Sequence, residues 1–337
     1  MDWTKGFSAS YYMTVVDGTT WRDIDTIQIT GGSIKKDSSG LLQSADVDCV
    51  RYPQGLEQWV RIWLNVDQEG SVGHVPLFTG LACSPEKQFS GNLETNRVQC
   101  YSVLKPADDV YLDRGWYAPS GISGASLVRQ LLEVTTAPVI EDANSPVLET
   151  SIIAEDNETM LSMSEKILKA INWRIKINGY GEIQICANDD TPVIQMDSVD
   201  YDIVEPQVTV KHDWYDCPNV FRAIEDDVMA IARDDDESSV LSTINRGREV
   251  WMQETNCNLN DGETVAEYAQ RRLKEEQSVA MQLSYSRRFV PDVDPTDVVR
   301  LHYPSLDIDY NARIDSQTID IGYGSKVSEG VSRVWQI

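Results

Sequence analysis

Closely spaced β-strand patterns dominate the N-terminal third of the chain and most constrain the folds that it can adopt. Three segments alternate apolar and polar residues with the period of a half-buried strand: TIQITGGSI (26–34), ADVDCVRY (45–52) and QWVRIWLNV (58–66). Polar turn sequences such as DQEGSVG (67–73) follow these segments. Strands at such close spacing predict a small antiparallel barrel or sandwich over residues 1–111.

The pattern changes to helical spacing in the middle of the chain. One helix is predicted from a run of apolar residues with a helical period: Leu127, Val128, Leu131, Leu132 and Val134. A second helix is predicted in NETMLSMSEKILKAINW (157–173), with Asn157 as its cap. The next segment, WRIKINGYGEIQICA (173–187), alternates on both sides of the turn NGYG and predicts a β-hairpin. Together these elements predict a small α+β domain over residues 112–200.

Residues 201–337 return to strand patterns, interrupted by one helix at about 261–280. Asn260 and Glu263 have the spacing of a capping box at its start. Its expected apolar face consists of Val265, Ala269 and Leu273, and its expected ion pairs are Glu267–Arg271 and Arg271–Glu275. The predicted fold class is therefore α+β and mainly β, with two small antiparallel β-barrels flanking a helix-plus-hairpin domain.

The net charge of the chain argues against some classes of binding partner. The chain has 54 acidic and 29 basic residues, a net charge of −25. Nucleic acids and anionic lipids are bound through lysine and arginine, so this balance argues against both as direct ligands.

The N-terminus lacks the pattern of a secretory signal, and no apolar run is long enough to span a membrane, which predicts synthesis in the cytoplasm and no membrane insertion. The six cysteines lie far apart without a Cys-x-x-Cys pair and are predicted to be reduced, buried packing residues.

Acidic residues supply the candidate sites. The segment SYSRRFVPDVDPTDVVRLHYP (284–304) places Asp292, Asp294 and Asp297 between two strand patterns. These carboxylates have three interpretations: a general acid and base, a metal cradle, or a turn in which acids satisfy backbone donors. Glu225–Asp227 and Arg233–Ser239 are further acidic segments, and the second of them lacks the residue order of an EF-hand loop. In so acidic a chain, coincidental acid pairs are expected.

Other motifs with chemical meaning are missing from the sequence. His74, His212 and His302 fall in unrelated segments, and no zinc-binding spacing, nucleophile elbow or phosphate-binding loop occurs. The tryptophans that could line a polysaccharide cleft, among them Trp59, Trp63 and Trp173, fall in patterns that predict core positions. The sequence therefore predicts no catalytic, cofactor-binding or metal-binding residue, and no cofactor.

The order of the parts resembles a known family. The capped helix and hairpin from Asn157 to Asp189 resemble the middle domain of baseplate-hub and tail-tip proteins of tailed bacteriophages and phage-like tails. In that family a β-barrel precedes this module and a second barrel follows it. CPNVFRAI (217–224) and GETVAEYAQRRLKEEQ (262–277), followed by 284–304, resemble the closing half of the same hub. The resemblance covers nearly the whole chain by domain order.

This resemblance implies a structural virion protein. Its barrels would be tail-tube-like, and three copies would form a homotrimeric ring that continues the tail tube and lets DNA pass without binding it. The implied partners are tail tube or distal tail proteins, the tape measure protein, and tail spike or fibre proteins. The implied location is the virion tail, after assembly in the host cytoplasm. The segment VPDVDPTD (290–297) would then be a structural turn.

Two alternatives remain open at this level. One is a carbohydrate-active tail enzyme that uses an Asp/Glu pair, for which 292–297 supplies the candidates. The other is a glycan-binding β module without chemistry.

Overall fold

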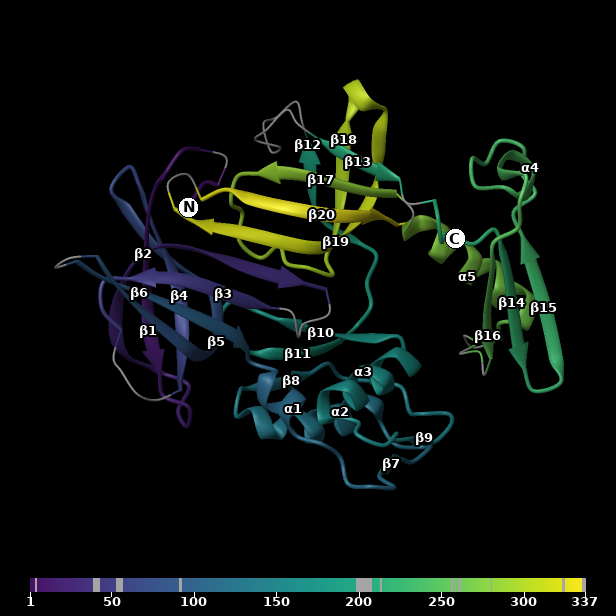
Figure 1. The fold of residues 1–337 in the computed structure, drawn as a ribbon, viewed down its shortest axis with the longest axis horizontal. Helices are drawn as coiled ribbons and strands as arrows, with labels where there is room; N and C mark the ends of the chain where they lie inside the picture. Colours follow the sequence, from purple (N-terminus) through teal and green to yellow (C-terminus); the bar gives the residue numbers. More distant parts are fainter. Residues whose placement is uncertain are drawn as a thin grey trace. The chain divides into compact units, whose positions relative to one another are not determined.

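The computed structural model describes residues 1–3, 5–38, 43–52, 57–90, 93–197, 208–212, 214–255, 257, 259, 262–279, 281–322 and 325–334. The fold is mainly β with several helices, so the predicted α+β class is confirmed (Figure 1). The chain divides into two compact units. Unit 1 contains Met1–Asp189, Ser286–Asp297 and Asp315–Glu329, and unit 2 contains Asp190–Tyr285, Val298–Ile314 and Gly330–Ile337. The division into three domains stays a prediction.

Six strands at the N-terminus of unit 1 belong to a larger sheet, in which β2 also pairs with β19, and we call these six the N-terminal sheet. The predicted segments 26–34 and 58–66 fall within β2 and β4, whereas 45–52 overlaps β3 and extends past its end at Cys49. The bounds of the six strands are β1 Ser8–Val16, β2 Asp23–Asp37, β3 Ser44–Cys49, β4 Gln58–Gln68, β5 Ser71–Ser90 and β6 Leu93–Ser102. Neighbouring strands pair in the order β1-β4-β5-β6-β3-β2. Because β1 also pairs antiparallel with β2, from Tyr12↔Gln28 to Val16↔Asp23, the pairings close into a circuit. Alternate residues of β4, namely Val60, Ile62 and Leu64, are fully buried and belong to the hydrophobic core of this sheet.

The helix-and-hairpin module belongs to the same unit. Its helices are α1 Lys105–Asp109, α2 Gly124–Leu132, the 3-10 helix Glu133–Thr135 and α3 Met160–Ala170. Its strands are β7 Tyr117–Ala118, β8 Val139–Glu141, β9 Ile152–Ile153, β10 Trp173–Ile177 and β11 Ile183–Ala187. Strands β10, β11 and β8 form one sheet, against which α2 and α3 pack (Figure 1). The predicted apolar residues Leu127, Val128, Leu131 and Leu132 of α2 are all buried.

The cap of α3 differs from the prediction. Thr159, not Asn157, is the N-cap: Thr159 Oγ1 accepts from Ser162 N at 3.1 Å, and Ser162 Oγ accepts from Thr159 N at 3.0 Å. Asn157 instead has a φ of +66°, in the left-handed region that asparagine tolerates better than most residues. The prediction was wrong because Asn157 and Thr159 are both residue types that cap helices. Asn157 adopts the left-handed conformation of the turn before the helix, and Thr159 caps the helix itself.

The predicted hairpin is confirmed, with β10 and β11 paired from Trp173↔Ala187 to Ile177↔Ile183. Its turn packs closely on the N-terminal sheet of unit 1. Tyr180 O accepts from Trp21 Nε1 at 2.9 Å and from Arg61 Nη2 at 3.1 Å. Gly179 O accepts from the Thr79 hydroxyl at 2.8 Å. The turn therefore carries backbone acceptors for donors of the sheet.

Glycine is required in this turn by the closeness of the contact. A Cβ at Gly179 would lie 1.9 Å from Pro76 O, a backbone atom that cannot swing away. We expect Gly179→Ala to lower the free energy of unfolding by about 1–3 kcal/mol, the usual cost of overpacking. Urea unfolding followed by tryptophan fluorescence measures this. Gly6→Ala is the matched control, because no atom lies within 4 Å of a Cβ built there, and an equal loss in both variants would contradict the steric explanation.

Unit 2 contains the remaining elements, with the division between the units falling inside β17, β19 and β20. The strands are β12 Pro192–Asp197, β13 Thr209–His212, β14 Val220–Glu225, β15 Val228–Arg233, β16 Trp251–Thr255, β17 Met281–Arg287, β18 Val298–Tyr303, β19 Ile308–Ile321 and β20 Val327–Arg333. The helices are α4 Thr243–Arg246, α5 Val265–Val279 and the 3-10 helix Pro304–Leu306. Within unit 2, β18 pairs in parallel with β12 and antiparallel with β19, and β13 pairs antiparallel with β17.

Helix α5 packs against a separate three-stranded sheet, β15-β14-β16, and not against a second barrel as predicted. The predicted apolar residues Val265, Ala269 and Leu273 are buried, together with Tyr268, whose pKa is raised by burial to about 12. They contact buried side chains of this sheet, among them Phe221. The periodicity identified the face of the helix correctly, but no local pattern indicates which strands cover it.

Polar side chains cap α5 and form ion pairs along it. The predicted cap residue Asn260 is outside the described residues, and a capping box is formed instead by Thr264 and Glu267, with Glu267 N donating to Thr264 Oγ1 and Thr264 N to Glu267 Oε2. The hydrogen bond from Thr264 N holds the pKa of Glu267 below its usual range. Glu267 therefore serves the cap, whereas Arg271 pairs with Glu263 and, as predicted, with Glu275.

Candidate functional site

The acid loop, which we define as residues 290–297, connects β17 to β18. Two of its residues have left-handed backbone conformations, Asp292 with a φ of +60° and Thr296 with a φ of +78°. A β-branched residue rarely adopts such a φ, so tertiary contacts must hold Thr296 in place. One such contact is a hydrogen bond from the Arg174 guanidinium to Thr296 O. The loop is therefore fixed by its surroundings.

Asp297 is the most deeply buried carboxylate of the acid loop, with 2% of the residue exposed. It accepts two hydrogen bonds from Lys176 Nζ, at 2.9 and 2.8 Å, and lies 3.8 Å from Arg174 Nη2. Its Oδ2 also accepts from Asp294 N at 3.0 Å, which closes the turn. Asp297 thus attaches the loop to strand β10 and satisfies a backbone donor, as the structural interpretation of this turn requires.

Asp294 makes a second attachment, to the N-terminal sheet of unit 1. Lys36 Nζ on β2 donates to Asp294 Oδ1 at 2.6 Å, and both side chains are largely buried. A hydrogen bond between ionised groups is stronger than a neutral one, especially where water is excluded. Two of the three candidate carboxylates are therefore neutralised by cations of the same unit.

A buried ion pair lies beside the loop. Arg287, 1% exposed, donates from Nε and Nη2 to the two carboxylate oxygens of Glu329, at 2.9 and 2.6 Å. Gln317 Nε2 bridges this pair to the loop, since it donates to Glu329 Oε1 at 2.9 Å and to Val293 O at 2.8 Å. The bidentate geometry and the third donor satisfy the carboxylate, which a buried charge needs to be tolerated.

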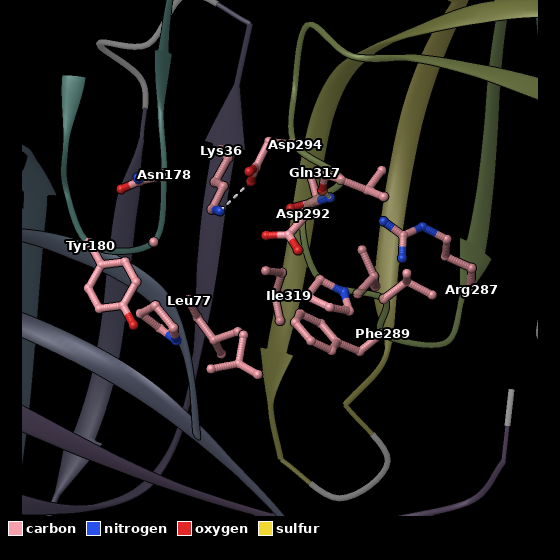
Figure 2. Close-up of a pocket in the computed structure, with 17 residues that line it drawn as sticks. Lys36, Leu77, Asn178, Tyr180, Arg287, Phe289, Asp292, Asp294, Gln317 and Ile319 are labelled. Carbon is pink, nitrogen blue, oxygen red and sulfur yellow. Dashed lines mark hydrogen bonds and ion pairs between the residues drawn. The ribbon is translucent and has the colours of Figure 1, made fainter. Parts of the chain in front are cut away.

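A cavity of about 190 Å³ lies next to these groups. Figure 2 shows the Lys36–Asp294 pair and the Asp292 side chain on one side of it, and Phe289 and Leu77 among its apolar lining. A cavity of this volume is smaller than a typical small-molecule pocket, which is roughly 300–1,000 Å³. Asp292 and Asp294 both line the cavity. Of the three acids, Asp294 and Asp297 each bind a lysine, whereas no ion pair of Asp292 is found among the described residues.

Glycoside hydrolysis needs two carboxylates that face the same bond, one of which must be protonated. At the acid loop, Asp294 is instead bound to the Lys36 ammonium group, and Asp297 to the Lys176 ammonium group beside the Arg174 guanidinium. The arrangement is suited to holding a turn against β2 and β10.

The other acidic segments also form turns. Asp226 and Asp227 connect β14 to β15, with a φ of +49° at Asp226. In the segment 233–239, Asp236 accepts from the Ser238 N and hydroxyl at 2.8 and 2.7 Å, and the first of these hydrogen bonds lowers the pKa of Asp236. Asp234 accepts from the Ser239 hydroxyl at 2.6 Å. Asp234 and Asp236 thus bind donors of their own loop, and Asp234 also accepts from Gln277 Nε2 of α5 at 3.1 Å.

The described residues contain no group of three or more His, Cys, Asp or Glu placed to hold a metal ion. His74 lies 3.4 Å from the Tyr12 hydroxyl on the N-terminal sheet of unit 1, and His302 lies 3.5 Å from Asp309 in unit 2. The side chain of His212 is outside the described part of the chain. Among the described helices, none combines the length and apolar character that crossing a membrane requires.

The cysteines and tryptophans follow the predictions in part. All six cysteines are free thiols, and four of them, Cys49, Cys100, Cys217 and Cys257, are buried as predicted; burial raises the pKa of Cys49 to about 11. Trp173 is buried, whereas Trp59 and Trp63 are half-buried. The Trp63 ring lies parallel to Tyr12, with its indole N–H bound to the Thr14 hydroxyl, so neighbouring side chains surround it.

The fold of the whole chain matches solved structures of phage tail proteins. A 43 kDa tail protein of prophage MuSo2 from Shewanella oneidensis matches with a TM-score of 0.67 and 14% identity, over 96% of this chain and 97% of that chain. A tail protein from Neisseria meningitidis matches with a TM-score of 0.70 and 12% identity, over 97% and 96%. A prophage tail protein from Listeria monocytogenes matches with a TM-score of 0.60 and 11% identity, over 97% and 95%.

No protein-family model matches the chain, and no curated protein sequence matches it either. The similarity is therefore one of fold. This chain has the fold of phage tail proteins along nearly its whole length, and the family resemblance seen in the sequence is confirmed at that level.

Proposed function

We propose that this chain is a structural protein of a phage or phage-like tail, a baseplate hub or tail-tip component located in the virion. The observation that carries the proposal is the full-length match to tail proteins, in which nearly all of both chains is covered. A shared domain alone would leave the function open, because one fold serves many functions. A shared order of all parts supports a shared place in the tail.

The geometry of the acid loop supports a non-enzymatic role. Asp294 and Asp297 are occupied by Lys36 and Lys176, so the acid pair that a tail glycosidase would need is not available in this arrangement. The glycan-binding alternative receives less support than the tail proposal, because the aromatic side chains around Trp63 pack on one another.

The ring is the finer part of the proposal. The closed circuit of β1 to β6 would serve as one tube-like barrel, and strands β12, β13 and β17 to β20 would supply the second. Three copies would then offer six barrel positions to the tail tube, with spike or fibre proteins and the tape measure protein as further neighbours. A net charge of −25 suits a wall along which DNA slides, since a polyanion is repelled and no counterions are released on contact.

We expect the purified full-length protein to form trimers, because cyclic closure covers surfaces that each copy leaves exposed. Mass photometry and sedimentation velocity over a concentration series measure this. A three-fold ring with a central hole in negative-stain images is the expected appearance. A chain that stays monomeric even when mixed with tail tube protein would contradict the hub proposal.

A further inference from the structure

The three-stranded sheet of unit 2 packs against α5 through the face that contains Phe221, Ala223 and Ala232 (Figure 1). Residues that pair directly across strands share a face, so the register defines the other face. We call it the arginine face; it consists of Val220, Arg222, Ile224, Met229, Ile231, Arg233, Trp251, Gln253 and Thr255. Three of its large apolar side chains are exposed, Met229, Ile231 and Trp251, the last at 47%, whereas Val220 at the start of β14 is fully buried.

The arginine face has the composition of a protein interface. The guanidinium groups of Arg222 and Arg233 lie over the Trp251 ring, 5.8 and 6.0 Å from its centroid. Tryptophan, methionine and arginine are enriched at protein interfaces, and tryptophan and arginine also at binding hot spots. None of the nine described residues of this face is acidic, although the chain has nearly twice as many acidic as basic residues; Glu249, which precedes β16, pairs with Arg233 and accepts from Trp251 Nε1 at 2.8 Å, so Arg222 carries the charge that Glu249 does not neutralise. The face therefore fits an acidic surface with an apolar centre.

Unit 1 of the same chain presents such a surface. Strands β7 and β9 belong to a two-stranded ribbon with one register from Tyr117↔Ile153 to Ser123↔Val147. Ala118 on its inner face is fully buried in the core, whereas Tyr117, Val147 and Ile153 on its outer face are exposed, Ile153 at 71%. We call this outer surface the acidic ribbon.

The name describes its charge. Residues 111–124 and 146–156, which form and flank the ribbon, contain four acids and one arginine: Asp113, Glu149, Glu155, Asp156 and Arg114. The net charge of these two segments is −3; Asp156 pairs with Arg114 and Glu155 with Lys166 of α3, which leaves Asp113 and Glu149 as the acids outside these two pairs. An apolar centre with surrounding negative charge is complementary to the arginine face, and such complementarity governs which surfaces associate.

We propose that the arginine face of one copy binds the acidic ribbon of a second copy. The two surfaces differ, so the contact is heterologous, and each copy has one surface of each kind. Contacts of this type close into rings when the rotation between copies permits it. The inference rests on the ring of the proposed function and assigns the surfaces that hold it together.

The test reverses charge in the full-length protein. Arg222→Glu with Arg233→Glu is expected to raise the dissociation constant of the ring at least about tenfold, because like charges would then face each other. Adding Asp113→Lys and Glu149→Lys to that variant is expected to restore association. The matched control is Arg97→Glu with Arg129→Glu, which reverses two exposed arginines outside both surfaces and should leave association unchanged. Sedimentation velocity measures association, and circular dichroism checks the fold.

The outcomes separate this inference from the function that it rests on. A wild-type trimer whose arginine variant remains equally trimeric overturns the assigned surfaces and leaves the ring intact. A variant that dissociates but is not restored by the two lysines overturns the acidic ribbon as the binding surface. A wild-type protein that is monomeric at every concentration overturns the ring and this inference together. If the reversed variant misfolds, Trp251→Ala provides the same comparison, and undiminished association in it counts against the proposal.

Discussion

Replacing Glu329 with Ala is expected to lower the free energy of unfolding by about 3–5 kcal/mol, the usual cost of removing one partner from a buried ion pair. The carboxylate is fully buried, and its loss leaves the buried Arg287 guanidinium without its bidentate partner. Gln317 Nε2 also loses an acceptor, which adds to the cost. Urea unfolding followed by tryptophan fluorescence provides the measurement.

A double replacement is the control that identifies the mechanism. Arg287→Met with Glu329→Leu removes both charges and keeps apolar volume, and such exchanges are often neutral or stabilising. We therefore expect the double variant to be more stable than Glu329→Ala, although it loses more hydrogen bonds. A double variant that is as unstable as the single one would mean that the hydrogen bonds, not the uncompensated charge, dominate.

Local structure followed well from local sequence. The hairpin at residues 173–187 formed around its Gly-containing turn, and the apolar faces of α2 and α5 were identified from periodicity alone. These features depend on side chains within a few positions of one another, where spacing determines which of them meet.

Tertiary partners did not follow from the sequence. Lys176 and Asp297 are 121 positions apart, and Lys36 and Asp294 are 258 apart. No local pattern predicts such pairs. The sequence held one weak signal of the Lys176–Asp297 pair. Arg174 and Lys176 lie on the same face of a predicted strand, and two cations there would need an acidic partner if another part of the chain covered that face.

The sheet that covers α5 was missed for a related reason. Strand β16 pairs in parallel with β14, which requires a long connection, and only antiparallel neighbours joined by short turns are visible in a strand pattern. The parallel pairing of β12 with β18 was missed in the same way.

Graded effects at the acid loop are the last expectation. Asp297→Asn keeps the shape of the side chain but removes the charge that Lys176 and Arg174 neutralise. We expect this variant to lose about 2–4 kcal/mol in the free energy of unfolding, slightly less than the roughly 3–5 kcal/mol typical of a fully buried ion pair, because Lys176 is partly exposed. Asp294→Asn breaks one contact with Lys36 and should cost about 1–2 kcal/mol. Asp292→Asn should cost about 0.5 kcal/mol or less, as for surface changes away from such contacts.

This order discriminates between a structural and a catalytic loop. Acids that serve catalysis are commonly kept at some expense of stability, so neutralising them tends to leave stability unchanged or to raise it while activity is lost. A structural loop gives the opposite result: stability falls in proportion to the ion pairs removed, and Asp292→Asn has the same oligomeric state as the wild type. Measuring unfolding, oligomeric state and hydrolysis of a cell-wall glycan on the same three variants decides the matter. Glycan hydrolysis by the wild type that disappears in Asp292→Asn at unchanged stability would establish the loop as an active site instead.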